Sequence, residues 1–199
     1  YIIGYFLLLV FLFVCQKPLF MLYNGAFEKE ITLSEYVQVL WHGISLDATT
    51  AGYLVAFPFL LILISIWLKK VPLKKILLPY YMIVSTLISI VFIVDMGLYT
   101  FWGFKLDASI FLYLDSPKEA LASVTVGFIA IRVTAILLLI IFNSWLMLKV
   151  TPSRLEKTSK KVLCTGLMLL LGGLLFVVIR GGITESTANV GQVYFSNNQ

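Results

Sequence analysis

The sequence predicts an all-α membrane protein, a bundle of five transmembrane helices with short amphipathic interfacial helices in its two outer loops. Three observations indicate this class: 60% of the 199 residues are apolar, only 13% are charged, and the apolar residues gather in five long runs. Soluble domains carry about 45–50% apolar and about 25% charged residues. A water-soluble core would not hide this much apolar surface, so lipid is the expected solvent for most of it.

The five runs cover residues 1–24, 48–68, 76–102, 123–148 and 162–180. Each is long enough to cross a hydrocarbon core of about 30 Å, which takes about 20 helical residues. In lipid a segment must satisfy its own backbone hydrogen bonds, and no alternating strand pattern occurs, so the runs are predicted to be helices. Residues 1–180 therefore form the predicted transmembrane domain. Residues 181–199 are polar and rich in Ser, Thr, Asn and Gly, which predicts an extracytoplasmic linker.

Basic residues predict the orientation of the chain. They are concentrated in the loops after the second and fourth spans, at Lys69, Lys70, Lys74, Lys75, Lys149, Arg154, Lys157, Lys160 and Lys161. The other loops and the tail hold only Lys29, Lys105, Lys118 and Arg180. Because cytoplasmic loops are enriched in Lys and Arg, the N-terminus is predicted to be cytoplasmic, and five crossings export the C-terminus. The positive charge is a topology signal, so nucleic acid is not an expected partner.

The two outer loops are predicted to contain interfacial helices. In the first, a helical stripe of apolar residues follows a capping box made by Thr32 and Glu35; it consists of Leu33, Tyr36, Val37, Leu40, Trp41 and Ile44. In the second, a short helix is expected around Ile110–Leu114, and Ser116-Pro117 begins the next one. Trp41 and Trp102 are the expected interfacial anchors. Two interpretations stand: the helices simply lie at the bilayer surface, or they form a platform beside a lipid headgroup.

Three ionisable residues interrupt the apolar runs, and they share a depth. Lys17, Asp95 and Arg132 all lie about 10 Å below the outer interface at 1.5 Å per residue. A lone charge inside a bilayer costs about 3 kcal/mol or more, so we expect Asp95 to pair with Arg132 or with Lys17. One interpretation is structural, with the long basic chains snorkelling. The other is recognition of an anionic lipid phosphate, which suits the donor fork of arginine.

His42 and Arg180 lie near the same interface and complete the set of candidate headgroup-binding residues. His42 is the single histidine, and no second soft or imidazole ligand accompanies it, so no metal site is predicted. The sequence also contains no P-loop, no GxGxxG motif and no Cys–His cluster. No catalytic residue is therefore predicted in residues 1–199.

Several segments resemble the membrane region of bacterial lipoteichoic acid synthase-like proteins, the membrane-bound sulfatase-type members of the alkaline phosphatase superfamily. The resemblance is to the branch found in Bacteroidetes, and it covers most of the chain in the expected order. The residues that carry it are FMLYN (20–24), WHGISLDATTAGY (41–53), FWGFKLDASIFLYLDSPKEALAS (101–123) and RGGITESTANVGQVYFSNNQ (180–199).

This resemblance implies a five-helix anchor in the bacterial cytoplasmic (inner) membrane, followed beyond Gln199 by an extracytoplasmic catalytic domain. In such proteins that domain uses a divalent metal (Mn, Mg or Zn) and a Thr or Ser nucleophile to move phosphoglycerol or phosphoethanolamine from a phospholipid, and related members hydrolyse sulfate or phosphate esters. None of the family's catalytic positions maps onto residues 1–199. Two alternatives stand beside this interpretation, a small transporter and a non-catalytic membrane scaffold subunit.

Overall fold

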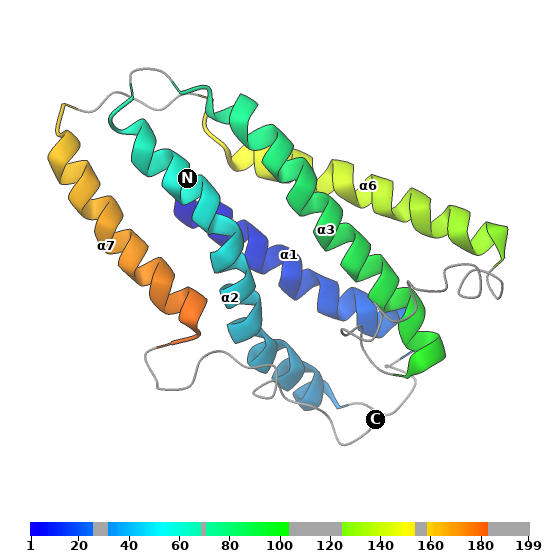
Figure 1. Ribbon diagram of the computed structural model, residues 1–199. Helices are drawn as coiled ribbons and strands as arrows, with labels where there is room; N and C mark the ends of the chain where they lie inside the picture. The colour runs from blue at the N-terminus through cyan, green and yellow to red at the C-terminus, as the bar shows by residue number, and fades with distance from the viewer. Residues whose placement is uncertain (26–31, 69–70, 104–124, 154–158, 183–199) are drawn as a thin grey trace. The chain divides into compact units, whose positions relative to one another are not determined.

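Five helices make up the described part of the chain, which covers residues 1–25, 32–68, 71–103, 125–153 and 159–182 of this computed structural model. They are α1 (Ile2–Tyr23), α2 (Leu33–Ser65), α3 (Leu73–Trp102), α6 (Val126–Val150) and α7 (Lys161–Arg180) (Figure 1). Each is long and apolar enough to cross a membrane, and no strand occurs in these ranges. The prediction of an all-α chain with five membrane-length helices is confirmed, and such a chain is consistent with a multi-pass membrane protein.

The predicted boundaries of four helices agree with the structure to within three residues. The second span differs, because residues 33–65 form one continuous helix instead of an interfacial helix followed by a separate span. No proline or glycine pair interrupts Ser45–Asp47, so the backbone ladder continues through the polar stretch that divides the two apolar runs. The helix also ends three residues before the predicted boundary. There the Ser65 hydroxyl donates to the Ile62 carbonyl at 2.6 Å, which competes with the helix ladder.

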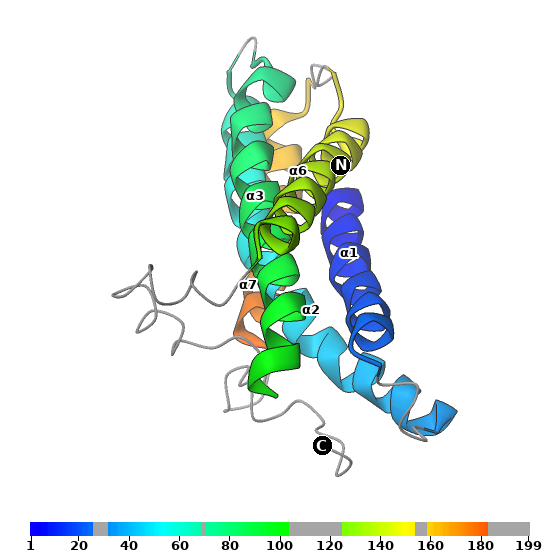
Figure 2. The same ribbon diagram turned by 90° about the vertical axis from the view of Figure 1, so that its right-hand side faces the viewer.

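Helix α2 is too long for one membrane crossing. Its 33 residues extend about 50 Å, whereas a hydrocarbon core is about 30 Å thick. Figure 2 shows that the first turns of α2 run in a different direction from the rest of the helix. The surplus length therefore lies in the N-terminal turns, where the sequence carries the apolar stripe that contains Trp41.

Two helix ends have well-defined caps, one of which the sequence predicts. Before α2, the Glu35 backbone N–H donates to the Thr32 hydroxyl at 3.3 Å, and the Thr32 backbone N–H donates to the Glu35 carboxylate at 2.9 Å. This reciprocal pair is the predicted capping box. After α7, Gly181 adopts a left-handed φ of 90°. Its N–H and that of Gly182 donate to the carbonyls of Val178 and Val177, both at 3.0 Å. This Schellman arrangement ends the fifth helix where the sequence changes character.

The chain divides into two compact units, Tyr1–Leu77 with Met147–Gln199, and Leu78–Leu146. In the first unit α2 contacts both α1 and α7. Helices α2 and α7 run antiparallel, as two hydrogen bonds near opposite ends of the pair show. The Thr49 hydroxyl donates to the Val178 carbonyl at 3.2 Å, and the Trp67 indole N–H donates to the Thr165 hydroxyl at 3.2 Å.

Between these two bonds, glycines allow α2 and α7 to approach closely. A Cβ added at Gly52 would lie 2.9 Å from Ile179 Cγ1, and one added at Gly172 would lie 2.9 Å from Phe59 Cζ. Each glycine thus receives a large side chain of the opposite helix. Lipid supplies no hydrophobic force between helices, so such contacts between small and large residues are a main source of their association.

The second unit has a polar seam between α3 and α6. Ser85, Ser89, Asn143 and Ser144 are all buried. The Ser144 hydroxyl donates to the Ser85 hydroxyl at 3.0 Å, and the Asn143 amide lies 3.5 Å from the Ser89 hydroxyl. Interhelical hydrogen bonds of this kind contribute about 0.6 kcal/mol each on average in membranes. The predicted elements of the second outer loop and of residues 183–199 lie outside the described residues.

The contact between Gly172 and Phe59 predicts different effects of alanine at two adjacent positions. Gly172→Ala forces its Cβ against the Phe59 ring, so we expect it to lower the free energy of unfolding by about 1–3 kcal/mol. Gly173→Ala is the matched control, because a Cβ there meets nothing within 4 Å and alanine favours helix by up to about 1 kcal/mol. Denaturant unfolding in detergent measures both changes, and equal effects would contradict the close approach of α2 and α7.

Candidate functional site

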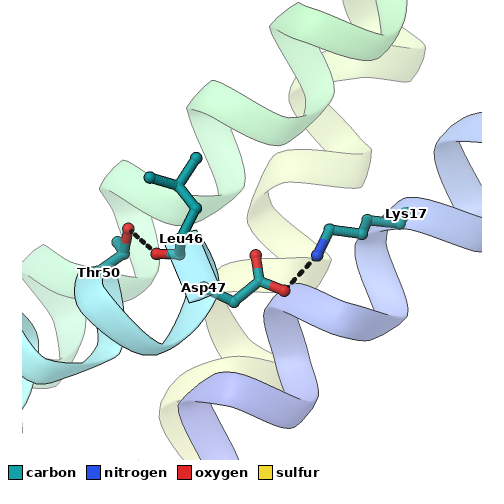
Figure 3. A network of polar contacts seen from close by, with 4 residues as sticks. All are labelled: Lys17, Leu46, Asp47 and Thr50. Carbon is teal, nitrogen blue, oxygen red and sulfur yellow. Dashed lines mark hydrogen bonds and ion pairs between the residues drawn. The ribbon is translucent and has the colours of Figure 1, made fainter. Parts of the chain in front are cut away.

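An ion pair joins α1 to α2. The Lys17 ammonium contacts the Asp47 carboxylate, as Figure 3 shows, and the two side chains are only 18% and 13% exposed. Lys17 lies one residue before Pro18, near the end of α1, and Asp47 lies after the surplus N-terminal turns of α2. The charges therefore lie at the junction between the surplus N-terminal turns of α2 and the remainder of the helix, which supplies the length needed for a single crossing.

Gly43 makes room for this ion pair. It precedes Asp47 by four residues, so both face the same side of α2. A Cβ added at Gly43 would lie 2.4 Å from Lys17 Nζ and 2.6 Å from Lys17 Cε. The Lys17 side chain thus crosses the surface of α2 at Gly43, which has no side chain. Its ammonium reaches the Asp47 carboxylate one turn further along the helix. Beside it, the Thr50 hydroxyl donates to the Leu46 carbonyl at 2.9 Å (Figure 3).

The same stretch of α2 also holds α7. Thr49, two residues after Asp47, donates to the Val178 carbonyl, and that carbonyl also accepts the Gly181 N–H of the α7 cap. A short segment of α2 thus fixes α1 through a charge pair and the end of α7 through a hydroxyl. We expected Asp95 to pair with Arg132 or with Lys17, and in the structure the ion pair of Lys17 is with Asp47.

Arg132 lies on α6 in the second unit, against α3. Its guanidinium carbon is 4.7 Å from the centroid of the Phe128 ring, one turn earlier on α6. An added Cβ at Gly97 would lie 3.5 Å from Arg132 Nε, an ordinary van der Waals contact, so the guanidinium packs closely on α3 there. Asp95 is half-buried and precedes Gly97 by two residues. Arg132 thus packs on α3 two residues from Asp95, and the pairing of the two charges stays a prediction.

Four further candidate residues lie at helix ends or on exposed surface. Trp41 is 73% exposed on the N-terminal turns of α2. His42 is also exposed, and its Nδ1 is 2.9 Å from the Gln38 carbonyl. A carbonyl only accepts, so the proton of the neutral ring lies on Nδ1. Arg180 is the exposed last residue of α7, where the helix dipole favours a cation. Trp102 is the last residue of α3.

The structure adds two residues that sequence reasoning missed, Gly43 and Asp47. Asp47 immediately precedes the predicted second span, so it counted as a residue of the loop. The signal that would have found it is the spacing of Gly43 and Asp47 on one helical face, at a depth that a lysine near the end of α1 can reach. As to metals, no three His, Cys, Asp or Glu side chains come together among the described residues.

The ion pair predicts that single and double substitutions differ in stability. Asp47→Leu leaves the Lys17 ammonium half-buried without its counter-charge, so we expect a loss of about 3 kcal/mol in the free energy of unfolding. Lys17→Met combined with Asp47→Leu should recover most of that loss, because an apolar pair needs no desolvated charges. Denaturant titration in detergent measures the coupling, and additive losses would contradict the pairing.

Gly43→Ala tests the same geometry without removing a charge. Its Cβ displaces the Lys17 ammonium from Asp47, so we expect a loss of about 1–3 kcal/mol despite the better helix propensity of alanine. Gly166→Ala is the control, because a Cβ there meets nothing within 4 Å. A gain in stability from both substitutions would show that Lys17 does not cross Gly43.

The charged residues are the main guide to the function of this chain, because comparison with known proteins gives none. No protein-family model, curated protein or solved structure matches this chain. The likeness of its segments to lipoteichoic acid synthase-like proteins therefore remains an expectation. The first unit holds the Lys17–Asp47 ion pair, and the second holds Arg132 and Asp95.

Proposed function

We propose that residues 1–180 are the membrane domain of a phospholipid-using phosphotransferase or sulfatase-type enzyme at the outer face of the bacterial cytoplasmic membrane. The domain anchors a catalytic domain that follows Gln199 and presents the donor lipid to it. Catalyst and donor then share one surface, which raises their effective concentration. The divalent metal and the nucleophile belong to the catalytic domain. The resemblance to lipoteichoic acid synthase-like proteins supports this assignment.

The proposed orientation places the N-terminus in the cytoplasm and the residues after α7 outside. It is supported by the nine Lys and Arg residues in the loops after the second and fourth spans. The five membrane-length helices of the described ranges would then bring the two ends to opposite sides. In this orientation the Lys17–Asp47 pair, Asp95 and Arg132 all belong to the outer half of the membrane.

The first turns of α2 are proposed to lie along the outer surface as a platform. Leu33, Val37 and Trp41 follow one another at four-residue spacing and are all exposed, with Leu33 at 79%. These turns exceed the length that one crossing requires. An exposed apolar stripe with a tryptophan suits the boundary between headgroups and acyl chains. The Lys17–Asp47 pair at the base of these turns fixes them to α1.

The observation that carries the lipid-binding part of the proposal is the position of Arg132. It lies six residues into α6, about 9 Å from the start of the helix, and packs on Phe128 and Gly97. A guanidinium at this depth reaches phosphate level by extending along its helix. It offers two parallel donors to a phosphate, which a lysine does not. Arg132 is the cation proposed to bind the headgroup phosphate.

Substitution of Arg132 tests the proposal in the complete polypeptide. Release of diacylglycerol from phosphatidylglycerol or phosphatidylethanolamine liposomes reports both transfer and hydrolysis. Arg132→Leu is expected to raise the donor-lipid concentration for half-maximal release roughly ten- to hundredfold, because a hydrogen bond to a charged group is lost. Arg132→Lys should lie between this variant and the wild type.

Lys149→Leu is the matched control, since it removes the same charge from the last turn of the same helix. It should leave the donor-lipid dependence unchanged. Wild-type behaviour of Arg132→Leu would reject headgroup binding by this residue. If the polypeptide keeps full activity when an unrelated membrane anchor replaces residues 1–180, the domain serves only as a tether and does not present the lipid.

A further inference from the structure

The hydroxyl of Thr49 makes its hydrogen bond outside its own helix. Thr50, Thr86 and Thr134 each donate to the carbonyl four residues earlier in the same helix, at 2.9, 2.7 and 2.8 Å. This is the usual way for a threonine inside a helix to satisfy its hydroxyl. Thr49 is buried and donates instead to the Val178 carbonyl of α7, at 3.2 Å. Its hydroxyl therefore serves the contact between two helices.

The Val178 carbonyl belongs to the cap that ends α7. It also accepts the Gly181 N–H at 3.0 Å, and the Gly182 N–H donates to the Val177 carbonyl at 3.0 Å. A carbonyl oxygen has two lone pairs, so Thr49 and Gly181 together use both. The left-handed φ of 90° at Gly181 ends the helix and sets the direction in which the chain continues. Thr49 is thus bonded to the turn that directs the chain out of α7.

Gly52 receives the same turn of α7. It follows Thr49 by three residues, so both lie on one face of α2. A Cβ added at Gly52 would lie 2.9 Å from Ile179 Cγ1 and 3.6 Å from the Ile179 backbone nitrogen. The backbone of α7 therefore approaches α2 closely at its last turn. Thr49 and Gly52, with Val178 and Ile179, form what we call the exit dock.

The exit dock and the platform belong to one continuous helix. Thr49 lies eight residues after Trp41 of the platform, about 12 Å along α2. No proline lies between them, so the backbone ladder is continuous. Two residues before Thr49, Asp47 binds the Lys17 ammonium of α1. The position of the platform and that of the exit dock are therefore both determined by α2.

We infer that Thr49 is a positioning residue: its bond to the Val178 carbonyl fixes the direction in which the chain leaves α7, relative to the platform of α2. The inference rests on the proposed function, in which this chain leads to the catalytic domain. A docked exit starts the catalytic domain from a fixed point beside the platform that presents the donor lipid, which favours productive orientation. Thr49 contacts neither the donor nor the reacting atoms and acts through the exit dock.

The distance between the platform and the exit tests the dock without any need for activity. Spin labels are attached at Val37→Cys and Arg180→Cys, two exposed positions, in the 199-residue chain with Cys15 and Cys164 replaced by Ala. Pulsed electron spin resonance in nanodiscs should give one main distance. Thr49→Val removes the hydroxyl and keeps the side-chain shape. It is expected to lower the ratio of the main distance to all others roughly threefold, the factor that corresponds to an average interhelical hydrogen bond in a membrane.

Two further variants make this measurement specific. Thr49→Ser keeps the hydroxyl and should retain the main distance. Thr50→Val is the matched control, because it removes a hydroxyl from the adjacent residue, whose bond stays within α2. It should leave the distance distribution unchanged. An unchanged distribution in Thr49→Val would overturn the inference, and so would equal changes from Thr49→Val and Thr50→Val.

The release of diacylglycerol by the complete polypeptide tests the consequence for the reaction. Thr49→Val should lower the maximal rate by up to about threefold and leave the half-saturating donor concentration unchanged, because Arg132 is proposed to bind the donor. Thr49→Ser should restore the rate. A wild-type maximal rate in Thr49→Val would overturn the positioning role. Absence of release by the wild type would reject the proposed function, whereas the exit dock is judged by the distances.

Discussion

The absence of hydrogen-bond partners in a bilayer core is the constraint on which this structure depends. Each spanning segment must satisfy its own backbone, so the chain forms long helices and leaves few polar groups to join them. What joins them in the first unit is a small set of specific contacts along α2. Lys17 passes over Gly43 to Asp47, Thr49 reaches the cap of α7, and Phe59 packs on Gly172. Helix α2 is thus the element that both neighbouring helices require.

This constraint also explains why the sequence predicts the helices so closely. Apolar runs of spanning length, the capping box at Thr32 and the Gly181-Gly182 end of α7 are local signals, and each is found at or near its predicted place. The failure at Ser45–Asp47 has the same origin. Hydropathy records where lipid contact is favourable, whereas helix continuity depends on the backbone, which nothing in that polar stretch interrupts. A loop was therefore predicted where the helix continues.

The candidate site was less predictable, because its geometry depends on which helix faces cross. Sequence position alone predicts one depth for Lys17, Asp95 and Arg132, and the structure places Arg132 against Gly97 of α3, two residues from Asp95. The partner of Lys17 depends on the rotation of α2, which turns Gly43 and Asp47 toward α1. The polar seam that contains Ser85 and Ser144 was not predicted for a related reason: small hydroxyl residues barely change the hydropathy of a span.

The polar groups of α2 and α7 lie near the two ends of this helix pair. Near one end, the charge pair and the Thr49 hydroxyl satisfy groups that lipid would leave without partners. Near the other, the Trp67 indole N–H donates to the Thr165 hydroxyl, and the Trp67 ring lies within cation–π range of Lys161. Specific polar contacts of the protein itself therefore join α2 and α7 at both ends of the pair, and the glycine contacts pack the helices closely along their length.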